Sequence, residues 1–182
     1  VSVVPNPKPL PDFYQKLSGV AISLTKDEVE YDPAYYTIKY PNGDVPKGKG
    51  VCTDVVIRAY RKLGIDLQKE VHEDMRNNFS KYPKNWGLSS TDRNIDHRLV
   101  PNLQVFFTRF GEVKPVTQNA SDYKPGDIVT WKLAGRLPHI GIVVHTKARS
   151  GNYNIVHNVG YGQVMEDCLF KYDITGHYRY KK

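Results

Sequence analysis

The sequence predicts an α+β protein in which N-terminal helices pack on a mostly antiparallel β-sheet. Apolar residues at helical spacing dominate the chain up to about residue 110, whereas short alternating segments bounded by turn residues dominate the remainder. Helices followed by a run of strands are typical of the α+β class. We find no repeat and no clean linker, so we expect one domain over residues 1–182, beginning with an extended proline-rich tail over 1–11.

Four segments in the first part of the chain have apolar residues at helical spacing. They are 12–29, 52–63, 66–79 and about 102–110, and Gly64 is a natural C-terminal stop for the second. One alternating, aromatic segment, 34–40, predicts a strand between the first two helices. The polar stretch 80–101 has little periodicity, and we expect an inserted loop that serves as a lid or binding wall.

The second part of the chain reads as a strand meander. The predicted strands are 126–133, 139–146, 153–159 and 177–180, which are joined by turn residues.

Composition and charge narrow the class of protein. Hydrophobic residues make up 40% and charged residues 25%, as in ordinary globular proteins, and no apolar run is long enough to span a bilayer. The formal net charge is +7, which favours polyanions such as an acidic cell-wall polymer. The basic residues are scattered and no nucleic-acid-binding signature is present, so we do not expect nucleic acid as a partner. The chain starts at Val1 without a signal segment, which suggests a mature form whose export signal has been removed.

Cys52 is the first candidate for chemistry, because it stands at the start of the helix predicted over 52–63. A helix N-terminus stabilises a thiolate by roughly 0.3–1 kcal/mol, so a strongly acidic thiol would also need a nearby imidazolium. The alternatives are a buried core thiol, a disulfide with Cys168, or a metal ligand. Two cysteines in 182 residues do not make a disulfide scaffold.

His139 is the best candidate partner for that thiol. It opens the apolar strand "HIGIVV", and Gly141 on the same face leaves room for another group to approach. His157 and Asn158 follow on what should be the neighbouring strand, where one of them can orient His139. Strand alternation places those two side chains on opposite faces, so only one can do so.

Together these segments resemble the NlpC/p60 cysteine peptidases of the papain-like clan. The resemblance is carried by "GVCTDVVIRAYRKLGIDL", "KPGDIVTWKL", "PHIGIVV" and "YNIVHN", in that order, over roughly residues 34–160. The thiol precedes the histidine strand, which implies the unpermuted arrangement. The chain departs from the family in having "CTD" rather than "CSG", a longer interval between His139 and His157, and the extra loop 80–101. These departures suggest a divergent branch of bacterial domains of unknown function.

The resemblance implies a papain-like NlpC/p60-type fold and a role for each residue. Cys52 would be the nucleophile, His139 the general base and acid, and His157 the orienting residue, with Asn158 as the alternative. The Cys52 backbone N–H would hold the oxyanion. Tyr40, twelve residues before the thiol, would assist it, with Tyr36 as a backup.

Three further assignments stay open between function and structure. Asp54 either faces the substrate or is a favourable acid in a first helical turn, His97 either lines a substrate groove or is a solvated loop residue, and Tyr40 is as well explained by packing. A metal site at Asp92, Asp96 and His97 has no supporting motif, so we predict no metal and no cofactor.

The function that these features predict is cysteine-dependent hydrolysis of an amide bond, most simply in peptidoglycan stem peptides. Same-fold amidase or acyltransferase activity on another substrate, or a non-catalytic wall-binding domain, are the alternatives. We expect a periplasmic or secreted monomer whose partner is peptidoglycan or a similar anionic wall polymer.

Overall fold

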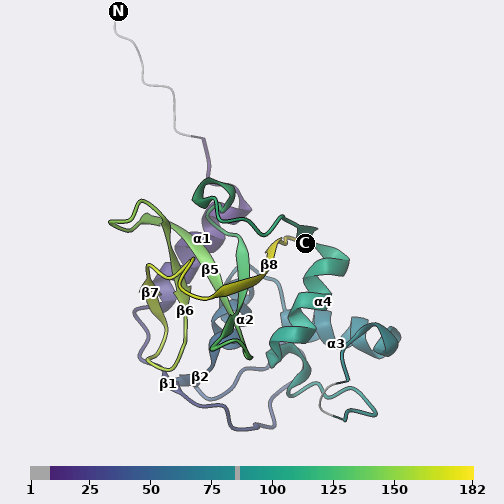
Figure 1. Cartoon of the computed structure of the whole chain (residues 1–182). Helices are drawn as coiled ribbons and strands as arrows, with labels where there is room; N and C mark the ends of the chain where they lie inside the picture. The colour runs from purple at the N-terminus through teal and green to yellow at the C-terminus, as the bar shows by residue number, and fades with distance from the viewer. Residues whose placement is uncertain (1–8, 85–86) are drawn as a thin grey trace, which may run out of the picture.

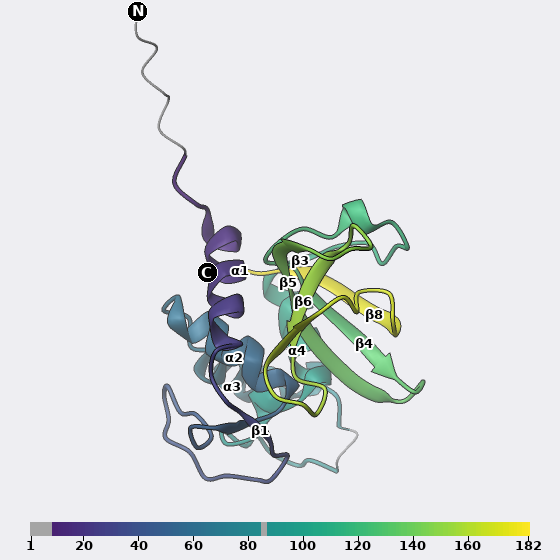
Figure 2. The same cartoon turned by 90° about the vertical axis from the view of Figure 1, so that its left-hand side faces the viewer.

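The computed structural model describes residues 9–84 and 87–182, and it has the predicted α+β architecture (Figure 1). Within these residues the four α-helices are α1 (Phe13–Leu24), α2 (Cys52–Lys62), α3 (Leu67–Asn77) and α4 (Val100–Phe110). Figure 2 shows α1, α2 and α3 as one layer beside the sheet. None of the described helices is long and apolar enough to cross a membrane.

The main sheet has six strands in the order β3-β8-β4-β5-β6-β7, and every pairing in it is antiparallel. Its strands are β3 (Glu112–Val113), β4 (Ile128–Leu133), β5 (Leu137–Lys147), β6 (Tyr153–His157), β7 (Val164–Glu166) and β8 (Asp173–Arg179). A separate pair, β1 (Glu30–Tyr31) and β2 (Lys49–Gly50), is parallel. The mostly antiparallel sheet predicted from the sequence is therefore confirmed.

Helix α1 shows how the local sequence sets an element and its face. Asp12 and Gln15 form a capping box at its start, with the Asp12 side chain accepting from the Gln15 amide. Leu17, Ala21 and Leu24 are fully or nearly fully buried, because they lie on the face that packs against the sheet. The helix ends at Leu24, earlier than the predicted 12–29.

The two faces of β5 are buried against different partners. Ile140, Ile142 and Val144 join the main core with the helices. The alternate face carries His139 and Val143, and Val143 joins a smaller core with Trp131 and residues of the loop after β7. The period-two alternation of a strand therefore places His139 on the face opposite the helical layer.

Two expectations about connecting segments need correction. Residues 34–40 do not form a strand; instead, side-chain contacts hold this segment, including the Ile38 amide donating to Asn94. The stretch 80–101 contains helical segments, since it includes the end of a short 3-10 helix (Phe79–Lys81), a second one (Asp96–Arg98) and the start of α4. Residues 85 and 86 of that stretch, and 1–8 of the predicted tail, lie outside the described residues.

Candidate active site

Cys52 is the first residue of α2, and its thiol is buried against β5. Val51 is extended, and its amide donates to the Asp54 side chain at 2.7 Å, which fixes the start of the helix at Cys52. Only 8% of Cys52 is exposed. The backbone N–H groups of Ile140, Thr53 and Cys52 itself stabilise the thiolate, as expected at a helix N-terminus.

Burial has a larger effect on the pKa of the thiol than these backbone amides have. Desolvation raises the pKa of the Cys52 thiol to about 12, and the nearby Asp54 charge acts in the same direction. Cys52 is therefore a neutral thiol at neutral pH in the unliganded protein. The acidic thiol that the sequence led us to expect is not supported by this environment.

His139, His157 and Glu166 form a continuous hydrogen-bonded chain, which we call the histidine relay. Nε2 of His139 lies 2.8 Å from Nδ1 of His157, and Nε2 of His157 lies 2.9 Å from a carboxylate oxygen of Glu166. The β5–β6 register pairs Gly141 with His157, so His139 and His157 are diagonal neighbours on one face. The relay thus comes from β5, β6 and β7.

The relay sets the position of each proton. A carboxylate only accepts, so Nε2 of His157 carries hydrogen and its Nδ1 is the acceptor in the neutral ring. Nε2 of His139 must then be the donor to His157. The remaining nitrogen of His139, Nδ1, is left bare, which is the form that a general base requires.

Both relay histidines are neutral. Burial lowers the pKa of His139 to about 3, and the adjacent His157 adds to that effect. Burial also lowers the pKa of His157, although Glu166 opposes the shift. The tautomers derived for neutral rings therefore describe the resting state.

Gly141 allows the strands of the relay to approach closely, as its position suggested. A Cβ at this residue would stand 2.8 Å from the Ile155 side chain and 3.1 Å from Cβ of His157. A larger side chain here would push β6, and with it His157, away from β5.

The structure brings Cys52 to β5 but shows no hydrogen bond between its thiol and His139 within the described residues. The thiol meets the backbone of Ile140, whereas the His139 ring lies on the other face, beside Trp131. Nδ1 of His139 also has no hydrogen-bond partner within the described chain. Catalytic hydrogen bonds are often long in unliganded proteins, so this geometry is compatible with a thiol–imidazole pair that forms on substrate binding.

A groove of about 270 Å³ runs past the thiol. Tyr31 and Arg98 supply its polar side chains, and Pro33, Val51, Ile95, Leu99, Val100, Pro101 and Pro138 complete the wall together with Cys52. The β1–β2 pairing sets Tyr31 opposite Gly50, two residues before the thiol. A mostly apolar groove with few polar groups is typical of a site for a small peptide-like ligand.

The tyrosine that lines the groove beside Cys52 is Tyr31, not the predicted Tyr40. Tyr40 packs against His72 and the Arg93 guanidinium, and it does not line the groove. Tyr36, the backup, donates to Asp32. Tyr31 lies at the groove because a tertiary strand pairing places it there, whereas counting residues back from Cys52 selects Tyr40.

The contacts of Asp54 and His97 favour a structural role over a role in substrate binding. Arg98 makes two contacts with the Asp54 carboxylate, both 3.0 Å, and this ion pair is buried. Asp54 also caps α2, so its carboxylate is already engaged. His97 is buried, burial lowers its pKa to about 3, and it does not line the groove.

Asn158 points away from the relay. Its carbonyl oxygen accepts from the Gly160 and Gly162 amides, which shapes the turn after β6. The structure therefore pairs His139 with His157 rather than with Asn158, as alternation along one strand permits only one of them.

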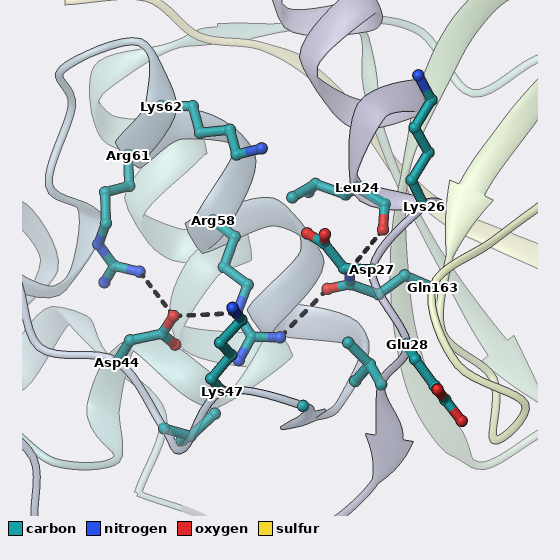
Figure 3. Close-up of a pocket in the computed structure, with 13 residues that line it drawn as sticks. Leu24, Lys26, Asp27, Glu28, Asp44, Lys47, Arg58, Arg61, Lys62 and Gln163 are labelled. Carbon is teal, nitrogen blue, oxygen red and sulfur yellow. Dashed lines mark hydrogen bonds and ion pairs between the residues drawn. The ribbon is translucent and has the colours of Figure 1, made fainter.

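A cavity lies apart from the Cys52 thiol and the histidine relay. It measures about 670 Å³ and is lined by basic and acidic side chains together with Leu24, Val29 and Val45. Figure 3 shows Arg58 held between Asp44 and Gln163, and Arg61 turned toward the same carboxylate. Neither Cys52 nor the relay histidines line this cavity, so it is not the site that the sequence motifs predict.

Sequence reasoning missed Glu166, Tyr31 and Arg98, and it considered Cys168 only as a disulfide partner of Cys52. Cys168 is buried, its sulfur lies 3.6 Å from Nε2 of His157, and both cysteines are free thiols. The one available signal was the alternation in "QVMED", which marks a short strand after the turn that follows β6.

Comparison with solved structures identifies the fold as that of the NlpC/p60 proteins. The chain is similar to NlpC1 from Trichomonas vaginalis, with 16% identity, a TM-score of 0.53 and 96% of this chain covered; it spans about half of that chain, 48%. It is equally similar to an N-acetylmuramoyl-L-alanine amidase from Bacteroides uniformis, with 14% identity, a TM-score of 0.53, and coverage of 93% of this chain and 99% of that one. At these identities the likeness shows the fold.

The chain belongs to the family described as "Domain of unknown function (DUF1287)", whose model matches residues 18–180. A relative in Escherichia coli (strain K12), the "Uncharacterized protein YijF", is 53% identical over 150 residues, which are 82% of this chain and 73% of the relative.

Proposed function

We propose that this protein is a cysteine-dependent hydrolase that cleaves an amide bond by acyl transfer. The observation that carries the proposal is the histidine relay, which leaves Nδ1 of His139 bare on the strand against which Cys52 packs. Nucleophilic cysteine chemistry needs a thiol at a helix N-terminus and an imidazole nitrogen that is free to take its proton, and Cys52 and Nδ1 of His139 are our candidates for these two groups.

The neutral resting state sets the order of steps. Attack of the Cys52 sulfur on the substrate carbonyl is coupled to transfer of the thiol proton to Nδ1 of His139. The imidazolium that results is stabilised through His157 by the Glu166 carboxylate. His139 then protonates the leaving amine, and afterwards takes a proton from the water that releases the acyl group.

The groove supplies the remaining roles. The backbone N–H of Cys52 at the start of α2 would stabilise the oxyanion. We take Tyr31, rather than Tyr40, as the side chain that contacts the substrate, because Tyr31 lines the groove together with Cys52.

We assign the substrate class as peptidoglycan stem peptides, such as the bond between D-glutamate and a diamino acid. The net charge of +7 suits an anionic wall, and a solved structure of the same fold is named as an N-acetylmuramoyl-L-alanine amidase. The protein would then act in the periplasm or outside the cell.

One observation favours a second candidate, a non-catalytic wall-binding domain. Burial keeps Cys52 protonated, whereas cysteine enzymes with a preformed ion pair hold a strongly acidic thiol. In that case the scaffold would bind peptidoglycan without cleaving it.

The deciding experiment is digestion of purified stem peptides, with products and acylated protein identified by mass spectrometry. We expect cleavage by the native protein, acylation on Cys52, and a loss of at least about 1,000-fold in Cys52→Ala and His139→Ala. Cys168→Ser is the matched thiol control and should retain cleavage. The opposite result is that the peptides stay intact, Cys52 stays unmodified and the native protein sediments with insoluble peptidoglycan. That result would reject the hydrolase and support the wall-binding domain.

A further inference from the structure

We propose that His157, Glu166 and Cys168 form a binding site for a divalent transition metal of the zinc type, and that the bound metal disables the relay. The three residues come from the end of β6, the end of β7 and the turn that follows it. Their ligand atoms all lie within 4.8 Å of one another. Metal binding is independent of the proposed function, whereas its inhibitory effect rests on it.

One of the three ligand separations equals that of a tetrahedral zinc site. Bonds of about 2.0–2.3 Å to nitrogen and sulfur put those two ligand atoms about 3.6 Å apart. Nε2 of His157 and Sγ of Cys168 are 3.6 Å apart, while Nε2 and the Glu166 oxygen are 2.9 Å apart. Two side chains must shift to hold one ion on Nε2. Sγ also lies 4.0 Å from Nδ1 of the same ring, so the Cys168 side chain must turn toward the Nε2 lone pair, and the carboxylate must move outward by about 0.5 Å.

The donor set selects the kind of metal. Imidazole, thiolate and carboxylate together favour zinc and similar transition metals, whereas magnesium and calcium prefer oxygen ligands alone. His157 and Cys168 are buried, but 38% of the Glu166 side chain is exposed, which gives the ion a route from solvent. Three protein ligands leave a fourth position for water.

Metal on Nε2 of His157 reverses the proton positions along the relay. Nε2 loses its hydrogen to the solvent, so the neutral ring must carry hydrogen on Nδ1. Nδ1 can then no longer accept from His139, whose Nε2 becomes the acceptor and whose Nδ1 gains a proton. The nitrogen that would receive the Cys52 proton is thereby occupied.

The protons balance with one net release. His157 gives up its Nε2 proton and His139 takes one from solvent on Nδ1, while the proton between the rings moves from His139 to His157. The Cys168 thiol loses its proton as the metal–sulfur bond forms. No oxidation or reduction is involved.

Cobalt substitution tests the site directly, because cobalt(II) bound to a thiolate absorbs in the near ultraviolet. The chain has two cysteines, so Cys52→Ala leaves Cys168 as the single thiol. We expect this variant to show a thiolate-to-cobalt band with one equivalent of cobalt, and zinc to displace it. The band should be lost in Cys52→Ala/Cys168→Ser, and Glu166→Gln should weaken binding at least tenfold. If Cys52→Ala gives no band, the metal site does not exist.

The effect on the relay is tested by titrating zinc into the stem-peptide assay. We expect inhibition of the native protein and at least tenfold weaker inhibition of Cys168→Ser, whose activity without metal should be unchanged. Equal inhibition of both would place the inhibitory zinc at Cys52 and overturn the regulatory part. A cobalt band in a protein that cleaves nothing would uphold the metal site and reject the proposed function.

Discussion

At the scale of single residues, the acidic end of the relay matters as much as its histidines. Glu166 sets which nitrogen of His157 carries hydrogen, and through that bond it sets the tautomer of His139. Glu166 does not line the groove at Cys52, so in the proposed mechanism it is a positioning residue.

Replacing the Glu166 carboxylate should lower the rate of the chemical step without changing substrate binding. In Glu166→Gln the side chain can still accept a hydrogen bond but loses its charge, so we expect kcat to fall about tenfold with KM unchanged. The pKa of His157 should fall further, because Glu166 raises it. Stem-peptide kinetics and histidine NMR measure the two effects. Glu112→Gln, at the opposite edge of the sheet, is the control, and an equal loss of kcat in both variants would contradict the role.

At the scale of elements, the N-terminus of α2 depends on a buried ion pair. Arg98 reaches Asp54 from the 3-10 helix Asp96–Arg98, and both side chains are nearly inaccessible. Arg98 also donates to the Ala34 carbonyl, which ties the 34–40 segment to the same point. Asp54 therefore holds the start of α2 in place through both its capping bond and this ion pair.

Breaking that pair should destabilise the protein strongly. Arg98→Met leaves the Asp54 carboxylate buried without its partner, so we expect a loss of about 3–5 kcal/mol in the free energy of unfolding. Arg98→Met/Asp54→Asn removes both charges and keeps a capping oxygen, and it should lose less. Urea denaturation followed by circular dichroism measures each value. Lys114→Met breaks the exposed pair with Glu112 and should cost under about 1 kcal/mol. The interpretation fails if Arg98→Met costs no more than this control.

At the scale of the whole molecule, neutral buried histidines make stability depend on pH. Burial lowers the pKa of His97 and of His139 from 6.5 to about 3. The unfolded chain therefore binds more protons than the folded one between these values, and stability falls as pH drops from 6.5 toward 3. Asp96 has the opposite effect on stability. Burial raises its pKa from 3.8 to about 6, so its contribution to the free energy of unfolding is lost as pH rises through that range.

The two histidines outweigh the single acid below pH 6. We expect the thermal unfolding midpoint to fall continuously from pH 7 to pH 4, and to fall less in His97→Gln, which cannot take up a proton. Differential scanning calorimetry over this range measures the slope. His72→Gln is the control, because His72 is only partly buried and its pKa is less strongly lowered. An equal slope in the native protein and His97→Gln would show that His97 is not a source of the acid sensitivity.

The sequence by itself determined the α+β class, the four main helices and the long strands of the sheet, because each is encoded in a local period of apolar residues. The same periodicity placed Cys52 at a helix start and His139 on a strand face beside His157. Only the tertiary structure decided the rest. The β1–β2 pairing selected Tyr31 over Tyr40, the hairpin of β6 and β7 brought Glu166 to His157, and burial decided that thiol and imidazole rest in neutral form. Strand register and desolvation arise from contacts between distant segments, and no local pattern of residues records them.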